Sequence, residues 1–156
     1  MQHIIDIQSA TKAPLPFSDT TLQLWANAAL AHETEPCELT LRFVTLEEIT
    51  QLNNTYRSQN KATNVLAFQS NLPDMVVLQE KFLGDVIICP DVLAQEVTRS
   101  ISLEAHWAHI VIHGILHLLG YNHIKEDEAQ QMQALEIQQI AKLGFANPYH
   151  EETTCD

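Results

Sequence analysis

The sequence is poor in the residues that cross-link or loosen a chain. Its three cysteines, Cys37, Cys89 and Cys155, lie far apart and show no CxxC spacing. This usage excludes a disulfide framework and a cysteine-based metal site. Four glycines and six prolines in 156 residues are too few for a disordered or fibrous chain, and 46% apolar residues can fill a core. We therefore expect a single domain over residues 1–156, with a loosely packed tail after about residue 145.

Basic residues and long apolar runs are also scarce. Eight Lys and Arg stand against 20 Asp and Glu, which gives a formal net charge of −12. Such a chain repels nucleic acid at long range, so any RNA must bind at a local basic patch or at a metal ion. The longest apolar run, residues 110–120, is too short to span a bilayer, and the N-terminus lacks the pattern of a signal peptide. We expect a cytoplasmic protein that binds no membrane.

Hydrophobic periodicity predicts an α+β fold. Short or alternating apolar runs indicate four strands, at residues 4–7, 39–43, 65–68 and 83–88. Capping and breaking residues, among them a Thr45–Glu48 capping box, indicate five helices, at residues 19–32, 45–56, 90–99, 102–119 and 126–143. Because strands and helices do not strictly alternate, we expect one small, mostly four-stranded mixed sheet packed with about five helices.

The segment HGILHLLGYNH, residues 113–123, carries the clearest chemistry. His113 and His117 are four residues apart, so both side chains lie on one face of a helix, about one turn apart. Gly120 then ends the helix and allows the chain to return His123 to the same ion. Three neutral imidazole ligands with an open fourth position are typical of a catalytic zinc site. We predict one metal ion per chain, zinc in the first place, with nickel or another divalent transition metal as alternatives.

A pair of histidines at this spacing also occurs by chance, and a lone histidine on an apolar face is usually a core residue. Three histidines with a helix-ending glycine between the second and the third favour the metal interpretation. His106 and His109 extend the row upstream. We interpret these two as partly exposed side chains near the site rather than as ligands.

The histidine spacing matches the metzincin pattern H-E-x-x-H-x-x-G-x-x-H at every position but one. Gly114 stands where those proteases carry the glutamate that activates water. The residues that hold metal are present and the protease base is absent, so peptide hydrolysis is disfavoured.

The motif, with HWAH just before it, resembles the YbeY family of bacterial single-strand endoribonucleases. The likeness extends through LNNTYRSQNKATNVLAF (52–68), LGDVIICPDV (83–92) and DEAQQMQALE (127–136). The resemblance implies a zincin-like fold and zinc-dependent cleavage of single-stranded RNA. It also implies maturation of the 3′ end of small-subunit (16S) ribosomal RNA and a role in ribosome quality control. The implied partners are ribosomal RNA and the small ribosomal subunit or its associated proteins, with no role for DNA.

The resemblance also implies roles for single residues. The zinc ligands would be His113, His117 and His123, and the family's functionally important arginine falls at Arg57. A guanidinium binds phosphate through two parallel hydrogen bonds, and Lys61 lies in the polar loop that follows. We assign Arg57 and His113 as the catalytic residues, against the alternative that Arg57 is a solvated surface side chain.

The sequence departs from the usual family pattern at four positions. Asn122 precedes the third histidine where Asp is common, and Asn60 and Ala62 replace Asp and Pro in the loop. Gln69 stands where Pro is usual. An amide at position 122 still accepts a hydrogen bond, so we expect it to orient the third histidine, although it cannot supply the charge of a carboxylate.

Two other functions stay open on the sequence alone. One is a ribosome-associated zinc-binding assembly factor with little nuclease activity of its own, which the acidic surface slightly favours. The other, less favoured, is a metalloprotease.

Overall fold

A mixed four-stranded sheet organises the computed structural model, which describes residues 3–70, 81–97, 101–121 and 125–149. The elements run in the order β1 (Ile4–Ser9), α1 (Asp19–Ala29), β2 (Cys37–Phe43), α2 (Leu46–Arg57), β3 (Val65–Gln69), β4 (Lys81–Ile88), α3 (Pro90–Glu96), α4 (Leu103–Leu118) and α5 (Glu126–Lys142). The predicted α+β class, with one four-stranded mixed sheet and five helices in the described ranges, is confirmed.

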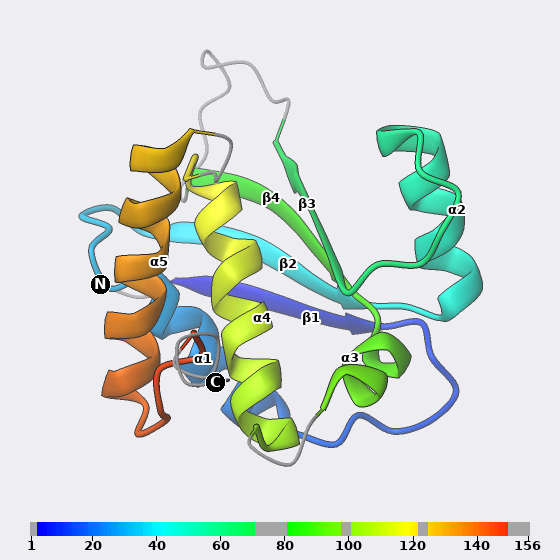
Figure 1. The fold of residues 1–156 in the computed structure, drawn as a ribbon, viewed down its shortest axis with the longest axis horizontal. Coiled ribbons are helices and arrows are strands. Elements are labelled where there is room, and N and C mark those ends of the chain that lie inside the picture. The colour runs from blue at the N-terminus through cyan, green and yellow to red at the C-terminus, as the bar shows by residue number, and fades with distance from the viewer. Residues whose placement is uncertain (1–2, 71–80, 98–100, 122–124, 150–156) are drawn as a thin grey trace, which may run out of the picture.

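The order of the strands places β3 at the edge of the sheet. The order is β1-β2-β4-β3, with β1, β2 and β4 parallel and β3 antiparallel to β4. Figure 1 shows α4 and α5 side by side across one face of this sheet, and α2 at the right of the view. The edge strand β3 thus lies between α2 and the C-terminal half of α4, and α4 contacts β3 directly.

Alternation along the strands builds a hydrophobic cluster on each face of the sheet. Leu39, Leu41 and Val86 belong to the larger cluster, which α1, α4 and α5 cover. Leu66 and Ile87 point the other way, into a smaller cluster with Ile49 of α2. The larger cluster fixes α4 against the sheet, and the smaller one fixes α2.

Side-chain caps begin three of the helices where the sequence predicts them. The hydroxyls of Ser18, Thr45 and Ser102 accept hydrogen bonds from backbone amides in the first turns of α1, α2 and α4. Half of the expected capping box forms. The Thr45 hydroxyl accepts a hydrogen bond from the Glu48 amide, but the Glu48 carboxylate pairs with Arg42 at 3.2 Å instead. No helix in the described ranges is long and apolar enough to cross a membrane.

Gly114 allows α4 to lie close to the sheet. A Cβ at this position would meet Val86 Cγ1 at 2.6 Å and Val65 Cγ2 at 3.1 Å, which is too close for the stiff valine side chains to absorb. The absence of a side chain at position 114 is therefore a packing requirement. A glutamate there would face the valines of β3 and β4, so this position offers no general base to a metal site.

We predict that Gly114→Ala lowers the free energy of unfolding by about 1–3 kcal/mol, because it overpacks the helix–sheet contact. Helix propensity alone gives the opposite sign, a gain of about 1 kcal/mol. Denaturant unfolding of wild type, Gly114→Ala, Val86→Ala and the double variant measures the coupling. In the Val86→Ala background, Gly114→Ala should be neutral or stabilising. A gain in stability from Gly114→Ala in the wild-type background would contradict this packing.

Candidate metal centre

A row of histidines runs along one side of α4, at His106, His109, His113 and His117. The spacings of three and four residues keep these side chains on one helix face, while the other faces are buried in the core. His106 pairs with Glu96 of α3 at 2.9 Å, away from the other three. The C-terminal three form a connected group.

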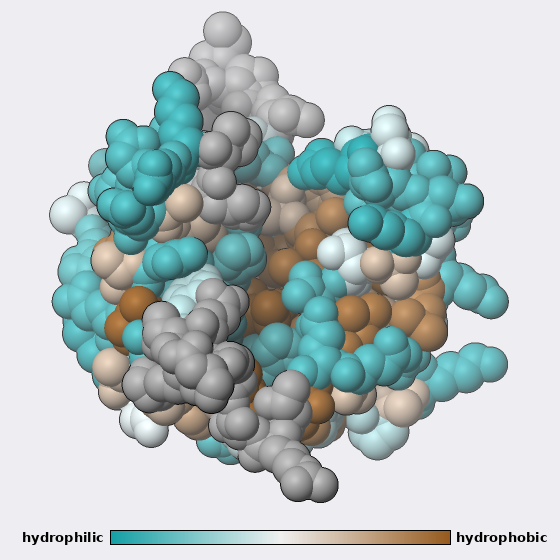
Figure 2. Space-filling model, viewed as in Figure 1, coloured by the Kyte–Doolittle hydropathy of each residue, from teal (hydrophilic) through white to brown (hydrophobic). Residues whose placement is uncertain are grey.

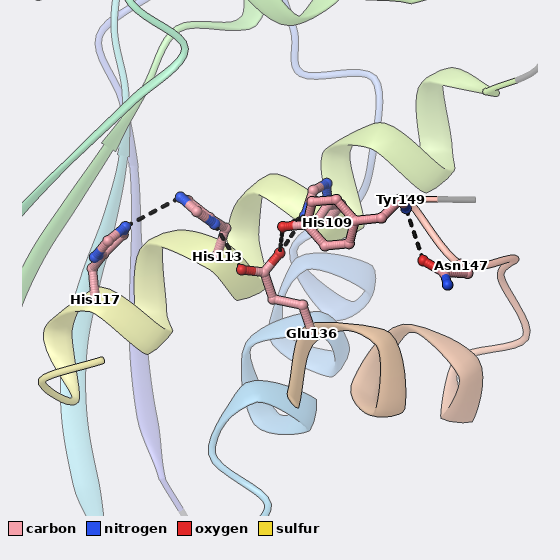
Figure 3. Close-up of polar contacts among 6 residues, drawn as sticks. All are labelled: His109, His113, His117, Glu136, Asn147 and Tyr149. Carbon is pink, nitrogen blue, oxygen red and sulfur yellow. Dashed lines mark hydrogen bonds and ion pairs between the residues drawn. The ribbon is translucent and has the colours of Figure 1, made fainter. Parts of the chain in front are cut away.

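His113 and His117 meet through their Nε2 atoms. These two nitrogens are 3.1 Å apart, and Figure 3 shows the rings pointing toward each other from successive turns of α4. His113 Nδ1 lies 2.9 Å from Glu136 Oε1, and His117 Nδ1 lies 3.0 Å from the backbone oxygen of Tyr121. Each imidazole is therefore held by an oxygen behind it and presents its other nitrogen to its neighbour.

Glu136 is the buried centre of this group. Its side chain projects from α5 and is 1% exposed. Its carboxylate accepts hydrogen bonds from His113, from His109 Nε2 and from the hydroxyl of Tyr149 (Figure 3). Burial by itself would raise the pKa of Glu136, but the hydrogen bonds from His109 and His113 outweigh it and lower the pKa to about 2. The group is thus an ionised acceptor at neutral pH.

These acceptors decide which nitrogen of each ring carries the proton. A backbone carbonyl only accepts, so His117 donates to Tyr121 through Nδ1–H. The ionised Glu136 likewise accepts from His113 Nδ1–H. In neutral imidazoles of this tautomer, both Nε2 atoms carry lone pairs, and these lone pairs face each other.

A second grouping of ligand atoms shares His113. Atoms of His109, His113 and Glu136 lie within 4.8 Å of one another, so these three residues can hold a metal ion. The structure therefore contains a cluster that can bind metal, although His109 was expected to be no more than a neighbour. The predicted third ligand, His123, and Asn122 before it lie outside the described residues.

A groove runs beside the histidine pair along the edge strand. It encloses about 570 Å³ and is lined by Arg57, Val65, Leu66, Ala67, Gln69, His117, Gly120 and Tyr121. Figure 2 shows a hollow with hydrophobic residues at its floor between α2 and the C-terminal end of α4. The structure thus brings Arg57 and His117, which are far apart in the sequence, to one concave surface, while Lys61 is an exposed residue of the nearby loop.

Arg57 is held against the edge strand. Its Nη2 donates to the backbone oxygen of Ala67 at 3.0 Å, and its Nη1 donates to the oxygen of Tyr56 at 3.3 Å. The guanidinium carbon lies 4.9 Å from the centre of the Phe68 ring. Arg57 is exposed and yet has a fixed position, which a freely solvated arginine would not have.

Gln69 ties the edge strand to the end of the histidine helix. Its Nε2 lies 3.3 Å from the backbone oxygen of Leu118 and 3.5 Å from that of His117. These carbonyls belong to the last turn of α4, where the regular i→i−4 ladder of the helix ends. The glutamine that replaces the usual proline therefore joins the two walls of the groove.

Comparison with known proteins settles the family. The model of the Endoribonuclease YbeY family matches residues 5–144. The chain belongs to the endoribonuclease YbeY family.

Named relatives in the YbeY family are similar in sequence to this chain over nearly its whole length. Endoribonuclease YbeY of Legionella pneumophila is 52% identical over 153 residues, which cover 97% of each chain. Endoribonuclease YbeY of Pseudomonas entomophila is 46% identical, over 96% of this chain and 95% of the relative. The solution structure of TM1509 from Thermotoga maritima is 22% identical, covers 97% of this chain and 93% of its own, and superposes with a TM-score of 0.60. This last likeness shows the fold.

Sequence reasoning missed two residues of the group, Glu136 and Tyr149. Glu136 occupies a position on the buried side of α5 between Met132 and Ile140, where an apolar residue is the rule. An acid on the apolar face of a helix was the available signal that it has a buried partner. Tyr149 offered no signal, because it follows the last helix in a segment without periodicity.

We predict that Tyr149→Phe lowers the free energy of unfolding by about 1.5–3 kcal/mol, because it removes a hydrogen bond to a charged, buried carboxylate. Denaturant unfolding measures the change. Tyr56→Phe is the matched control, since its ring is exposed and loss of its hydroxyl should cost less than about 0.5 kcal/mol. Equal effects of the two substitutions would show that the Tyr149 hydroxyl does not stabilise Glu136.

Proposed function

We propose that this chain is a zinc-dependent, single-strand-specific endoribonuclease that matures the 3′ end of 16S ribosomal RNA and takes part in ribosome quality control. Its relatives are named as endoribonucleases, and its groove brings His117, one of the histidine pair, and a fixed arginine together. We further propose that it acts in the cytoplasm as a single domain, on ribosomal RNA in or near the small subunit, and not on DNA. One observation carries the proposal: the two facing Nε2 atoms of His113 and His117.

In the Nδ1–H tautomer the two Nε2 lone pairs lie 3.1 Å apart, and a cation bound by both nitrogens relieves their repulsion. A divalent metal satisfies both at once, because two nitrogens bound to zinc at ~2.0–2.1 Å with a tetrahedral angle are about 3.3 Å apart. The separation in the protein is close to this value. Metal-binding histidines usually donate their other ring N–H to a carboxylate or a backbone oxygen, as His113 and His117 do.

The proposed ligands are therefore His113, His117 and His123, with Glu136 behind them. The alternative set, His109 with His113 and Glu136, requires His113 to bind metal through Nδ1. The Glu136 oxygens already accept hydrogen bonds from both histidines and from Tyr149, and His113 Nδ1 lies at hydrogen-bond distance from one of them. This bonding favours Glu136 as the residue that orients His113 rather than as a ligand.

The metal, when bound, would polarise a phosphoryl oxygen and activate water. Glu136 would keep His113 in the tautomer that presents Nε2 toward His117, which lines the groove. Arg57, on the opposite side of the groove, would bind the scissile phosphate through its planar guanidinium. Among the described residues that line the groove there is no Asp or Glu, so a carboxylate base is not part of the proposal.

The position of Gly114 argues against a metalloprotease. A Cβ at this position would meet the valines of the sheet, so the helix packing leaves no room for the glutamate that a metalloprotease requires there. The assembly-factor alternative differs from the nuclease in one measurable way, because it predicts no metal-dependent cleavage of RNA by the purified protein.

We predict that His117→Ala loses the single metal ion, while His109→Ala retains close to one per chain. Elemental analysis after dialysis measures both. His113 and Glu136 are unchanged in these variants, so the pair separates the two candidate ligand sets. Loss of metal in His109→Ala with retention in His117→Ala would overturn the proposed site in favour of the alternative one.

We predict that Arg57→Ala leaves the fold and the metal in place and lowers kcat/KM for single-stranded RNA by roughly 10²–10³-fold, as for loss of one transition-state donor. Arg57→Lys should recover only part of this, because an ammonium cannot form the two-pronged contact. The assay is cleavage of an RNA that carries the 3′ precursor end of 16S ribosomal RNA, with and without a chelator. Wild-type cleavage that survives the chelator, or full activity in Arg57→Ala, would contradict the proposal.

A further inference from the structure

Tyr56 is the exposed aromatic side chain of the structure. Among the large hydrophobic residues of the described ranges, Ile4, Leu24, Leu46 and Tyr56 are exposed, and Tyr56 is the one aromatic residue among them, with 60% of its surface accessible. It is the last residue but one of α2, directly before Arg57. An aromatic ring in solvent beside a functional arginine needs an explanation that core packing does not supply.

Phe68 holds both Tyr56 and Arg57 in place. The Tyr56 and Phe68 rings meet edge to face, with centroids 5.3 Å apart and planes at 65°. The Arg57 guanidinium lies over the same Phe68 ring. Phe68 itself packs against the smaller hydrophobic cluster of the sheet. The two exposed side chains are therefore pre-positioned by a partly buried ring, which lowers the entropy lost when a ligand binds them.

The segments around this surface lack acidic residues, although the whole chain is strongly acidic. The sequence has no Asp or Glu between Glu48 and Asp74, and none between Glu104 and Glu126. Every residue that lines the groove comes from one of these two segments. The first of them also contains Arg57 and Lys61. Asp85 of β4, the register partner of Phe68, lies one strand in from the edge.

The groove and its rim thus form a patch that repels a polyanion less than the rest of the chain does. Tyr56 lies beside the groove, because it directly precedes Arg57, which lines the groove and donates a hydrogen bond to Ala67 of the groove wall. An exposed ring beside a cation is the arrangement with which proteins bind the bases of single-stranded nucleic acid.

We propose that Tyr56 is a specificity-determining residue whose ring stacks with one unpaired base of the RNA, next to the phosphate that Arg57 binds. The inference rests on the proposed nuclease function and adds to it the origin of single-strand preference. A base inside a duplex has both faces covered by its neighbours and its edge paired, so it cannot stack on this ring. A base in a single strand can expose one face, which is then free to stack on the Tyr56 ring.

Steady-state kinetics on a single-stranded RNA test the proposal with the metal-loaded protein. Tyr56→Ala is expected to raise KM by roughly 5- to 150-fold with kcat nearly unchanged, because stacking anchors the substrate without taking part in bond cleavage. Tyr56→Phe and Tyr56→Trp retain a ring and should stay within a few-fold of wild type. Leu24→Ala, which removes an equally exposed side chain from α1, is the control.

Binding identifies the stacked base directly. The native Trp25 and Trp107 are buried, so the added indole of Tyr56→Trp is the accessible one. Its fluorescence should be quenched by a single-stranded oligonucleotide in the presence of a chelator and much less by the same oligonucleotide annealed to its complement. In a series of oligonucleotides with one abasic position each, one member should bind wild type weakly, and Tyr56→Ala should not distinguish that member from the others.

The outcomes separate this inference from the function on which it rests. If wild type cleaves RNA and Tyr56→Ala has an unchanged KM, or if duplex quenches the indole as well as single strand does, the stacking role is overturned and the nuclease stands. A fall in kcat without a change in KM also overturns it. If wild type neither binds nor cleaves RNA, both proposals fail.

Discussion

The contact between the buried Glu136 carboxylate and His113 Nδ1 is the interaction on which the proposed metal centre depends. It joins α5 to α4 through a charge that is almost wholly removed from solvent. A lone ionised carboxylate in such a place would be strongly disfavoured, and three donors, from His109, His113 and Tyr149, stabilise it. The direction of that contact turns His113 Nε2 toward His117, which the Tyr121 carbonyl orients in the same sense.

The rest of the fold places β3 beside the His113–His117 pair, where it forms the other wall of the groove. The edge strand β3 pairs antiparallel with β4 and lies beside α4, its Ala67 carbonyl accepts a hydrogen bond from Arg57, and its Gln69 side chain reaches the end of the helix. Gly114 permits the short distance between α4 and the sheet. Because the acid-free segments of the sequence supply this wall and the histidine helix, a chain with a net charge of −12 still presents a local surface for a polyanion.

The elements could be predicted because their signals are local. The four strands and five helices have periodic apolar residues and caps such as Ser102, and the His113–His117 pair follows from the helical repeat alone. The contacts of Glu136 and Tyr149 with α4 could not be predicted, because they depend on how distant helices pack. The sequence shows that Gly114 replaces the protease glutamate. The close approach of this position to Val86 could not be predicted, because it too depends on packing between distant segments. The expected capping box at Thr45 formed by half, since Arg42 from a neighbouring strand competes for Glu48.

We propose that both imidazoles carry their proton on Nδ1 and bind one ion through Nε2. Long-range ¹H–¹⁵N correlation spectra of the histidine-labelled, metal-loaded protein measure this directly, with each ring assigned by substitution. We expect Nδ1–H and metal-bound Nε2 for both His113 and His117. A His113 ring that is protonated on Nε2 and bound through Nδ1 would contradict it and would place the metal with His109 and Glu136 instead.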